Sequence, residues 1–113
     1  MHEMSIAEGI LQLIEEAARK EQAQRVTAVF LEIGQLASVE VESLRFCFDA
    51  VTRDSMAAGA RLEIIDVLGQ GWCLDCNQSV SLSEKLGGCP LCGSFRVQVT
   101  GGTEMRVIEL EVE

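Results

Sequence analysis

The sequence predicts an α+β fold in which a small domain of two helices on a three-stranded sheet carries an inserted cysteine module. Two segments repeat their apolar residues at the spacing of an amphipathic helix. Three others are rich in β-branched residues and are bounded by glycines or polar turns, as strands are. Between the last two of these strands lie two Cys-x-x-Cys pairs, flanked by glycines.

The first predicted helix begins at Ser5. Ser5 followed by Glu8 matches a capping box, in which the two side chains accept hydrogen bonds from backbone N–H groups at the helix start. Apolar residues then follow at helical spacing: Ile6, Ile10, Leu13, Ile14 and Ala17. This start predicts that residues 1–4 lie ahead of the helix, with backbone amides not committed to it and little buried surface.

The remaining elements follow from the same two patterns. RVTAVFLEIG (25–34) is β-branched and ends at a glycine, which predicts a strand. Residues 39–53 predict a helix whose apolar face carries Leu44, Cys47, Phe48 and Val51. Cys47 is therefore expected to be a small buried residue. RLEIIDVL (61–68) and MRVIELEV (105–112) predict two further strands.

The cysteine segment is expected to be an insertion. Strands precede and follow it, so the chain leaves its sheet and returns to it. Residues 1–68 with 104–113 are therefore expected to form one α/β domain, and residues 69–103 the inserted module. A chain of 113 residues is long enough for one domain with a small module.

The composition limits which kinds of partner and which cellular compartment are expected. The net charge of −9 is spread along the chain, whereas nucleic-acid binding needs clustered Lys and Arg. No apolar run approaches the ~20 residues that cross a bilayer, and no basic start followed by an apolar stretch suggests a secretory signal. Five cysteines, four of them in tight pairs, favour a metal site in a reducing compartment over a disulfide framework. We expect a cytoplasmic protein with neither a membrane nor a nucleic-acid partner.

The paired cysteines stand in CLDC and CPLCG, with twelve residues between the pairs: Cys73, Cys76, Cys89 and Cys92. Two such turns supply four thiolates, the tetrahedral set that Zn(II) takes in structural sites. A rubredoxin-like iron site uses the same ligands, and a redox dithiol is a further alternative, although it needs no second pair. Four sulfurs leave no open position for a substrate water. The expected metal is therefore a structural Zn(II) in a zinc-ribbon-like module.

The only histidine, His2, stands between Met1 and Glu3. The Met1 amine and the His2 amide nitrogen can close a five-membered chelate ring on one ion, and the amide and imidazole of His2 a six-membered one. The amide nitrogen of Glu3 can add a fourth donor. Nitrogen donors in a plane suit Ni(II) or Cu(II). Three residues alone do not distinguish this site from a solvated tail.

Taken together, three stretches resemble the HypA/HybF family of nickel-insertion proteins for NiFe-hydrogenase maturation. They are MHE, RVTAVFLEIGQLASVEVESLRFCFDAVTRDS and WCLDC…CPLCG. The resemblance extends over essentially the whole chain. It implies a metallochaperone that binds Ni(II) transiently, carries a structural Zn(II) and has no catalytic turnover. It also implies a GTPase partner of the HypB type and the hydrogenase large subunit as the destination of the nickel.

The same resemblance implies the ligands. His2 matches the nickel-binding histidine, with main-chain nitrogen from Met1 and Glu3. Glu40 matches a carboxylate position that can sit near the nickel, although an acidic residue at a helix start is also explained by the helix dipole. The zinc ligands are matched by Cys73, Cys76, Cys89 and Cys92.

Two other classes of function stay open on the sequence, as does the oligomeric state. A zinc-ribbon module that binds a protein partner needs no second metal. A small enzyme is disfavoured, because the sequence offers no second histidine as a base, no Gly-rich phosphate loop and no zinc with an open position. No pair of carboxylates stands out as a catalytic dyad.

Overall fold

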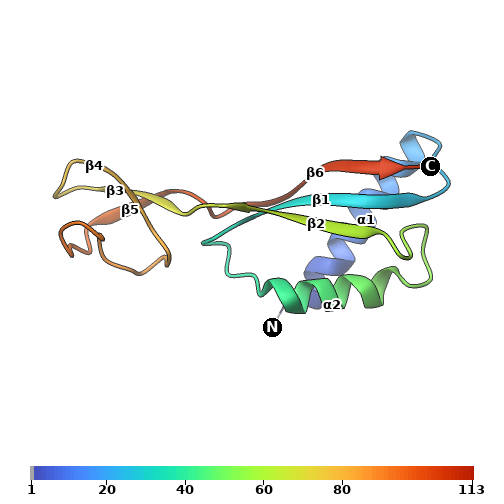
Figure 1. The fold of residues 1–113 in the computed structure, drawn as a ribbon, viewed down its shortest axis with the longest axis horizontal. Coiled ribbons are helices and arrows are strands. Elements are labelled where there is room, and N and C mark those ends of the chain that lie inside the picture. The colour runs from blue at the N-terminus through green and yellow to red at the C-terminus, as the bar shows by residue number, and fades with distance from the viewer. Residues whose placement is uncertain (1) are drawn as a thin grey trace. The chain divides into compact units, whose positions relative to one another are not determined.

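The computed structural model describes residues 2–113 (Figure 1). The helices are α1 (Glu3–Lys20) and α2 (Val41–Thr52). The strands are β1 (Val26–Gly34), β2 (Arg61–Val67), β3 (Gln70–Cys73), β4 (Gln78–Ser81), β5 (Val97–Gly101) and β6 (Met105–Val112). They form two sheets, with the orders β2-β1-β6 and β4-β3-β5. The predicted fold class, two helices and a three-stranded sheet with an inserted cysteine module, is confirmed.

The chain divides into two compact units. The first contains Met1–Leu31, Val39–Ile64 and Val107–Glu113, and the second contains Glu32–Ser38 and Ile65–Arg106. Residues 32–38, 65–68 and 104–106, which were expected in the first domain, lie in the second unit with the cysteine module. For residues 32–38 the reason is packing, because Leu36 is buried in the core of the second unit.

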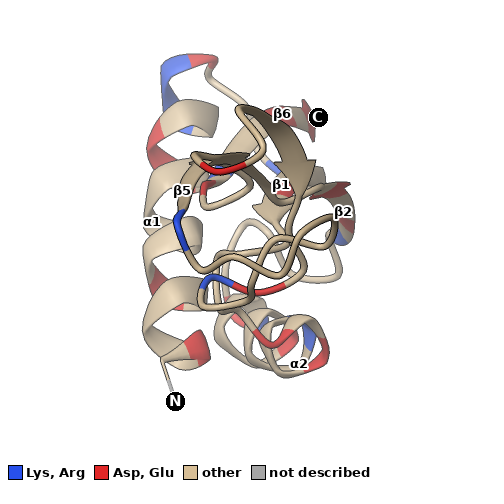
Figure 2. Ribbon diagram, turned by 90° about the vertical axis from the view of Figure 1, so that its left-hand side faces the viewer, with Lys and Arg blue, Asp and Glu red and all other residues tan. Residues whose placement is uncertain are grey.

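The core of the first unit forms between its sheet and the two helices. Strand β1 is central and β6 is an edge strand. The helices pack against each other and lie on one side of the sheet (Figure 2). Helix α2 buries Leu44, Cys47 and Phe48, as expected from its spacing. Of the stripe expected on α1, Ile10 and Ile14 are buried, whereas Leu13 is exposed. The largest fully buried apolar side chains of the unit are Ile14, Leu31, Leu44, Val26 and Val29.

Helix α1 begins two residues earlier than predicted. Its N-cap is His2, no side chain caps it, and the first intrahelical bond runs from the Ile6 N–H to the His2 carbonyl at 3.0 Å. The expected capping box at Ser5 is therefore wrong. A tertiary contact explains the extension: Glu3 is only 5% exposed, and its Oε2 accepts the Glu40 N–H at 3.1 Å. The expectation of little buried surface before Ser5 fails at Glu3.

The second unit is a three-stranded antiparallel sheet around β3. Strand β3 pairs with β4 (Gly71 opposite Val80) and with β5 (Gly71 opposite Val99). A side chain at Gly71 has no room, because an added Cβ would lie 2.6 Å from Leu82 Cδ1 and 2.7 Å from Val97 Cγ1. The core of this unit is small: Leu36, Cys73, Val80, Leu82 and Cys89. Two of its five members, Cys73 and Cys89, belong to the Cys-x-x-Cys pairs, so an ion bound to them would stabilise a unit with few apolar residues.

Acidic residues are distributed along both helices (Figure 2). The segments of the first unit contain 13 acidic and 6 basic residues, and thus most of the net charge of −9. Over residues 2–113, no helix has the length and apolar character that a membrane span requires.

Candidate metal sites

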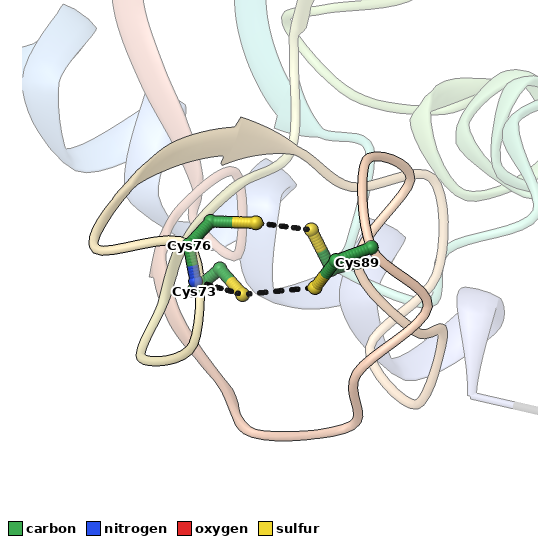
Figure 3. Close-up of side chains that lie close together, drawn as sticks. Cys73, Cys76 and Cys89 are labelled. Atoms are coloured by element: carbon green, nitrogen blue, oxygen red, sulfur yellow. Dashed lines mark hydrogen bonds between the residues drawn. The ribbon is translucent and has the colours of Figure 1, made fainter.

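The paired cysteines meet at one point in the second unit (Figure 3). Their sulfurs all lie within 4.8 Å of one another, with Cys73 Sγ 3.7 Å from Cys92 Sγ and Cys76 Sγ 3.8 Å from Cys89 Sγ. Four sulfurs at about 2.3 Å from one tetrahedral Zn(II) lie about 3.8 Å apart. The four sulfurs could therefore bind one tetrahedral ion without rearrangement.

The first Cys-x-x-Cys turn lies between β3 and β4. Cys73 is the last residue of β3, and the Asn77 N–H donates to its carbonyl at 2.8 Å. The Cys76 N–H donates to Cys73 Sγ at 3.3 Å. Asn77 closes the turn with a φ of 57°, a conformation that asparagine tolerates better than most residues. This turn aims both sulfurs to one side and gives one of them a backbone donor.

The second turn repeats this arrangement. The Gly93 N–H donates to the Cys89 carbonyl at 2.8 Å, and the Leu91 N–H donates to Cys89 Sγ at 3.4 Å. Gly93 has a φ of 78°, which explains the glycine after the second cysteine of CPLCG. N–H groups that point at sulfur favour the thiolate, the form in which cysteine binds a metal.

The thiols differ in how readily they ionise. Hydrogen bonding to Cys92, together with burial and the other two sulfurs, raises the pKa of Cys76 to about 12. Burial acts in the same direction on Cys89, but the N–H groups of Leu91 and Cys92 outweigh it and lower its pKa to about 7. Four clustered thiolates repel one another, so the complete set forms only around a cation.

A polar network joins the two turns on their exposed side. Asp75, inside CLDC, accepts hydrogen bonds from the Ser94 hydroxyl and, at 2.7 Å, from Arg96 Nη1. The Arg96 N–H donates to Ser94 Oγ at 3.0 Å, and the Ser94 carbonyl accepts from the Cys89 N–H at 2.7 Å. These residues were not predicted from the sequence, where the only signal was a charged residue inside the first cysteine pair and another four residues after the second.

The amino-terminal residues are arranged differently. Met1, the predicted amine donor, lies outside the described residues, and His2 is exposed. Within residues 2–113, the cysteines are the only set of three or more metal-ligating side chains gathered at one point. His2, Glu3 and Glu40 therefore do not form a cluster of side-chain donors.

Both carboxylates near His2 already accept hydrogen bonds from the backbone. The Glu40 N–H, which Glu3 accepts, lowers the pKa of the Glu3 carboxyl, and burial of the side chain opposes this only in part. Glu40 is the N-cap of α2, and its Oε1 accepts the Glu42 N–H at 3.2 Å. The acidic residue at the start of α2 thus has a structural role as its cap, independent of any metal. The Glu3 carboxylate was missed, because only its main-chain nitrogen had been considered.

The first backbone nitrogens of α1 are free of helical bonds. A helix leaves its first four N–H groups without a carbonyl partner, and here the first one bonded is Ile6. The earlier helix start therefore does not commit the amides of His2 and Glu3 to the helix. The amide donors proposed from the sequence are compatible with the observed start.

Comparison with known proteins shows which family the chain resembles. A family model described as "Hydrogenase/urease nickel incorporation, metallochaperone, hypA" matches residues 1–112. "Hydrogenase maturation factor HypA" from Albidiferax ferrireducens is 64% identical, and the protein of the same name from Azotobacter chroococcum is 65% identical, each over the full length of both chains. The solution structure of "the Ni metallochaperone HypA from Helicobacter pylori" is 31% identical. It superposes with a TM-score of 0.69 and covers 99% of this chain and 97% of that one.

Proposed function

Since the chain belongs to the HypA family of nickel-incorporation metallochaperones, we propose that it binds Ni(II) at its amino terminus and delivers the ion during hydrogenase maturation. The destination in this proposal is the hydrogenase large subunit, and a GTPase of the HypB type assists the transfer. Both partners are inferred from family membership. A delivery protein of this kind acts without catalytic turnover and in the cytoplasm, where the metal centre is assembled.

The observation that carries the nickel site is the start of α1. The exposed imidazole of His2 lies next to backbone N–H groups that donate no hydrogen bond to a carbonyl of the helix. With the Met1 amine, these nitrogens complete a chelate of the kind that Ni(II) accepts. The family match begins at residue 1, so the proposed donors lie within the matched region.

The two nearby carboxylates have separate roles in this proposal. Glu3 contributes its main-chain nitrogen to the ion, while its buried carboxylate ties the first turn of α1 to Glu40. Only one oxygen of the Glu40 carboxylate, Oε1, accepts the Glu42 N–H, so the other can still bind an ion. Glu40 is therefore the reserve donor, used if the amine or an amide does not bind.

The second metal in the proposal is a structural Zn(II) held by the four cysteines. The sulfur separations fit its tetrahedral shell, and four thiolates leave no position open to a substrate. Bound there, the ion supplies folding energy to a unit with a small core. Zinc rather than iron is proposed because nothing else in the chain suggests electron transfer. A zinc protein is colourless, whereas iron in the same cage absorbs visible light.

The test of the nickel site is a comparison of Ni(II) affinity by calorimetry in four forms of the protein. They are the wild type, His2→Ala, a form with a short peptide ahead of Met1, and a form with the same peptide after Glu113. We expect the amino-terminal extension to weaken Ni(II) binding nearly as much as His2→Ala, since it converts the amine to an amide. The carboxyl-terminal extension is the control and leaves binding unchanged. Zinc content is the same in all four forms.

Each other outcome redirects the proposal. If His2→Ala abolishes binding but the amino-terminal extension is tolerated, the imidazole is a ligand and the amine is not, and Glu40→Gln becomes the next variant. If neither change affects Ni(II), the amino-terminal site is wrong. The chain is then a zinc protein whose interactions with its partners, rather than a second metal, perform its role.

A further inference from the structure

An apolar groove runs along one side of the first unit, between α1 and the edge strand β6. Its volume is about 580 Å³, and the residues used below, Leu13, Glu21, Ile108, Glu109 and Val112, all belong to its lining. Three of them are apolar and well exposed: Leu13 at 53%, Ile108 at 42% and Val112 at 40%. Leu13 belongs to the apolar stripe that the sequence assigned to the core. Its exposure leaves part of that stripe uncovered.

One wall of the groove is a strand edge with free backbone groups. In the sheet order β2-β1-β6, strand β6 pairs with β1 and has no second partner among residues 2–113. Glu113 exchanges both backbone hydrogen bonds with Arg25, at 2.9 and 3.2 Å. In an antiparallel ladder alternate residues face opposite sides, so Val112 and Leu110 direct their N–H and C=O groups away from β1. The groove therefore combines apolar side chains with an unpaired strand edge, the features by which sheets accept an added strand.

The charges of the groove limit what can bind. Glu21 and Glu109 are the charged residues of its lining, which holds no lysine or arginine. Strand β6 also carries Glu111, and the surrounding unit is strongly acidic. A second copy of the chain brings a further charge of −9 and glutamates on its own β6, and like charges across paired strands are destabilising. An occupant with apolar and basic residues meets no such repulsion.

We propose that the groove between α1 and β6 is a docking site for an extended segment of a partner protein in which apolar and basic residues alternate. The segment adds to the free edge of β6 as a fourth strand. Alternate residues of a strand point to opposite sides, so one set of its side chains enters the groove over Leu13 and the other faces solvent. Its lysines or arginines lie near Glu21 and Glu109, the charged residues of the lining. The proposal does not depend on nickel binding at the amino terminus.

The probe is a labelled eight-residue peptide of alternating lysine and valine, capped at both ends. A lysine–serine peptide and a glutamate–valine peptide serve as comparisons. Binding is followed by fluorescence anisotropy at about 0.15 M salt, where distant charges are largely screened. We expect saturable binding of the lysine–valine peptide and at least tenfold weaker binding of the other two. Hydrogen exchange of the Leu110 and Val112 amides slows when the peptide is bound.

Matched variants separate the groove from the general acidity of the protein. The double variant Glu21→Lys/Glu109→Lys weakens binding of the peptide at least tenfold. Asp54→Lys reverses an exposed charge that does not line the groove, and it changes the affinity for the peptide less than twofold. Leu13→Gln weakens binding severalfold. Phe46→Gln, which replaces a 76% exposed apolar residue of α2, leaves it unchanged.

Four results overturn the proposal. They are absence of saturable binding, equal binding of the lysine–serine peptide, equal effects of the groove and Asp54 charge reversals, and unchanged exchange at Leu110 and Val112. Light scattering tests whether a second copy of the chain occupies the groove instead. If the wild type is a dimer that Leu13→Gln converts to a monomer, a second copy fills the groove and the partner segment does not. Nickel affinity, measured in parallel, is expected to be the same in every variant.

Discussion

The crossing of Gly34 and Gly102 provides the sharpest test of how the second unit is built. Gly34 ends β1, and Gly102 follows β5 with a φ of 86°. A Cβ added at Gly34 would lie 2.1 Å from the Gly102 carbonyl oxygen and 2.9 Å from the Thr103 nitrogen. Both contacts are with backbone, so no side-chain rotation relieves them. We predict that Gly34→Ala destabilises the unit that holds the four cysteines.

The cost follows from what must move. Inserting a methyl group into packed structure costs about 1–3 kcal/mol. The displaced Gly102 oxygen accepts the Leu36 N–H at 2.7 Å, and the Gly34 N–H donates to the Glu104 carbonyl at 2.8 Å. Weakening these bonds adds about 1 kcal/mol in all. A total of about 3 kcal/mol lowers the Tm by roughly 12 °C, given the unfolding entropy typical of a chain of this length.

Thermal unfolding of the zinc-loaded protein, followed by circular dichroism, measures the effect. The matched control is Gly9→Ala, on the exposed side of α1, where an added Cβ meets no atom within 4 Å. There alanine raises helix propensity by about 0.8–1 kcal/mol, and the Tm should rise by roughly 4 °C. A Gly34→Ala protein as stable as the wild type would refute the close packing of Gly34 against the Gly102 backbone. The same Gly-to-Ala change therefore has opposite signs at the two positions.

Three further predictions concern the metals and the first turn of α1. Cys73→Ala and Cys92→Ala should each release the tightly held zinc, as measured by metal analysis. Each should also unfold the second unit, while α1 and α2 keep their far-ultraviolet circular dichroism signal. One equivalent of zinc retained in either variant contradicts the four-cysteine site. Nickel affinity should fall steeply between about pH 7.5 and 6, since an imidazole titrates near ~6.5 and an α-amine near ~8, and a flat profile would indicate carboxylate donors instead. The Glu3 pKa is lowered from 4.5 by the Glu40 N–H, so its contribution to stability is present above about pH 4.5 and lost as the pH falls through the folded-state pKa. Glu3→Gln should therefore unfold with less pH dependence below about pH 4.5 than the wild type in acid titrations, and identical profiles would contradict the contact.

The elements of the first unit could be predicted because their patterns are local. Helical spacing on α2 and β-branched runs on β1, β2 and β6 are properties of neighbouring residues, and the observed bounds agree within about two residues. The start of α1 could not be predicted in this way. Ser5 and Glu8 satisfy a local rule, but the helix starts at Glu3 because a buried carboxylate meets the Glu40 N–H from a distant part of the chain.

The cysteine cluster was predictable for a different reason. Two short turns fix the relative positions of their own sulfurs, so only one distance, between the turns, depends on the rest of the fold. The strands that set this distance, β3, β4 and β5, are four or five residues long and lack a clear alternation in sequence. The network of Asp75, Ser94 and Arg96 was missed because it joins residues about twenty positions apart through exposed side chains.

The contact between Glu3 and Glu40 changes the physical meaning of the proposed nickel site. A chelate built only from a free tail would be placed by the tail alone, and its position would vary with the chain end. Here the residue that follows His2 is buried, and its carboxylate is bonded to the residue that begins α2. In the proposed site, the amide of Glu3 would therefore hold the ion beside the start of α2. Glu40 is fixed at the start of α2 as its N-cap, and its own N–H donates to Glu3, so it is the first side chain to test as an additional ligand.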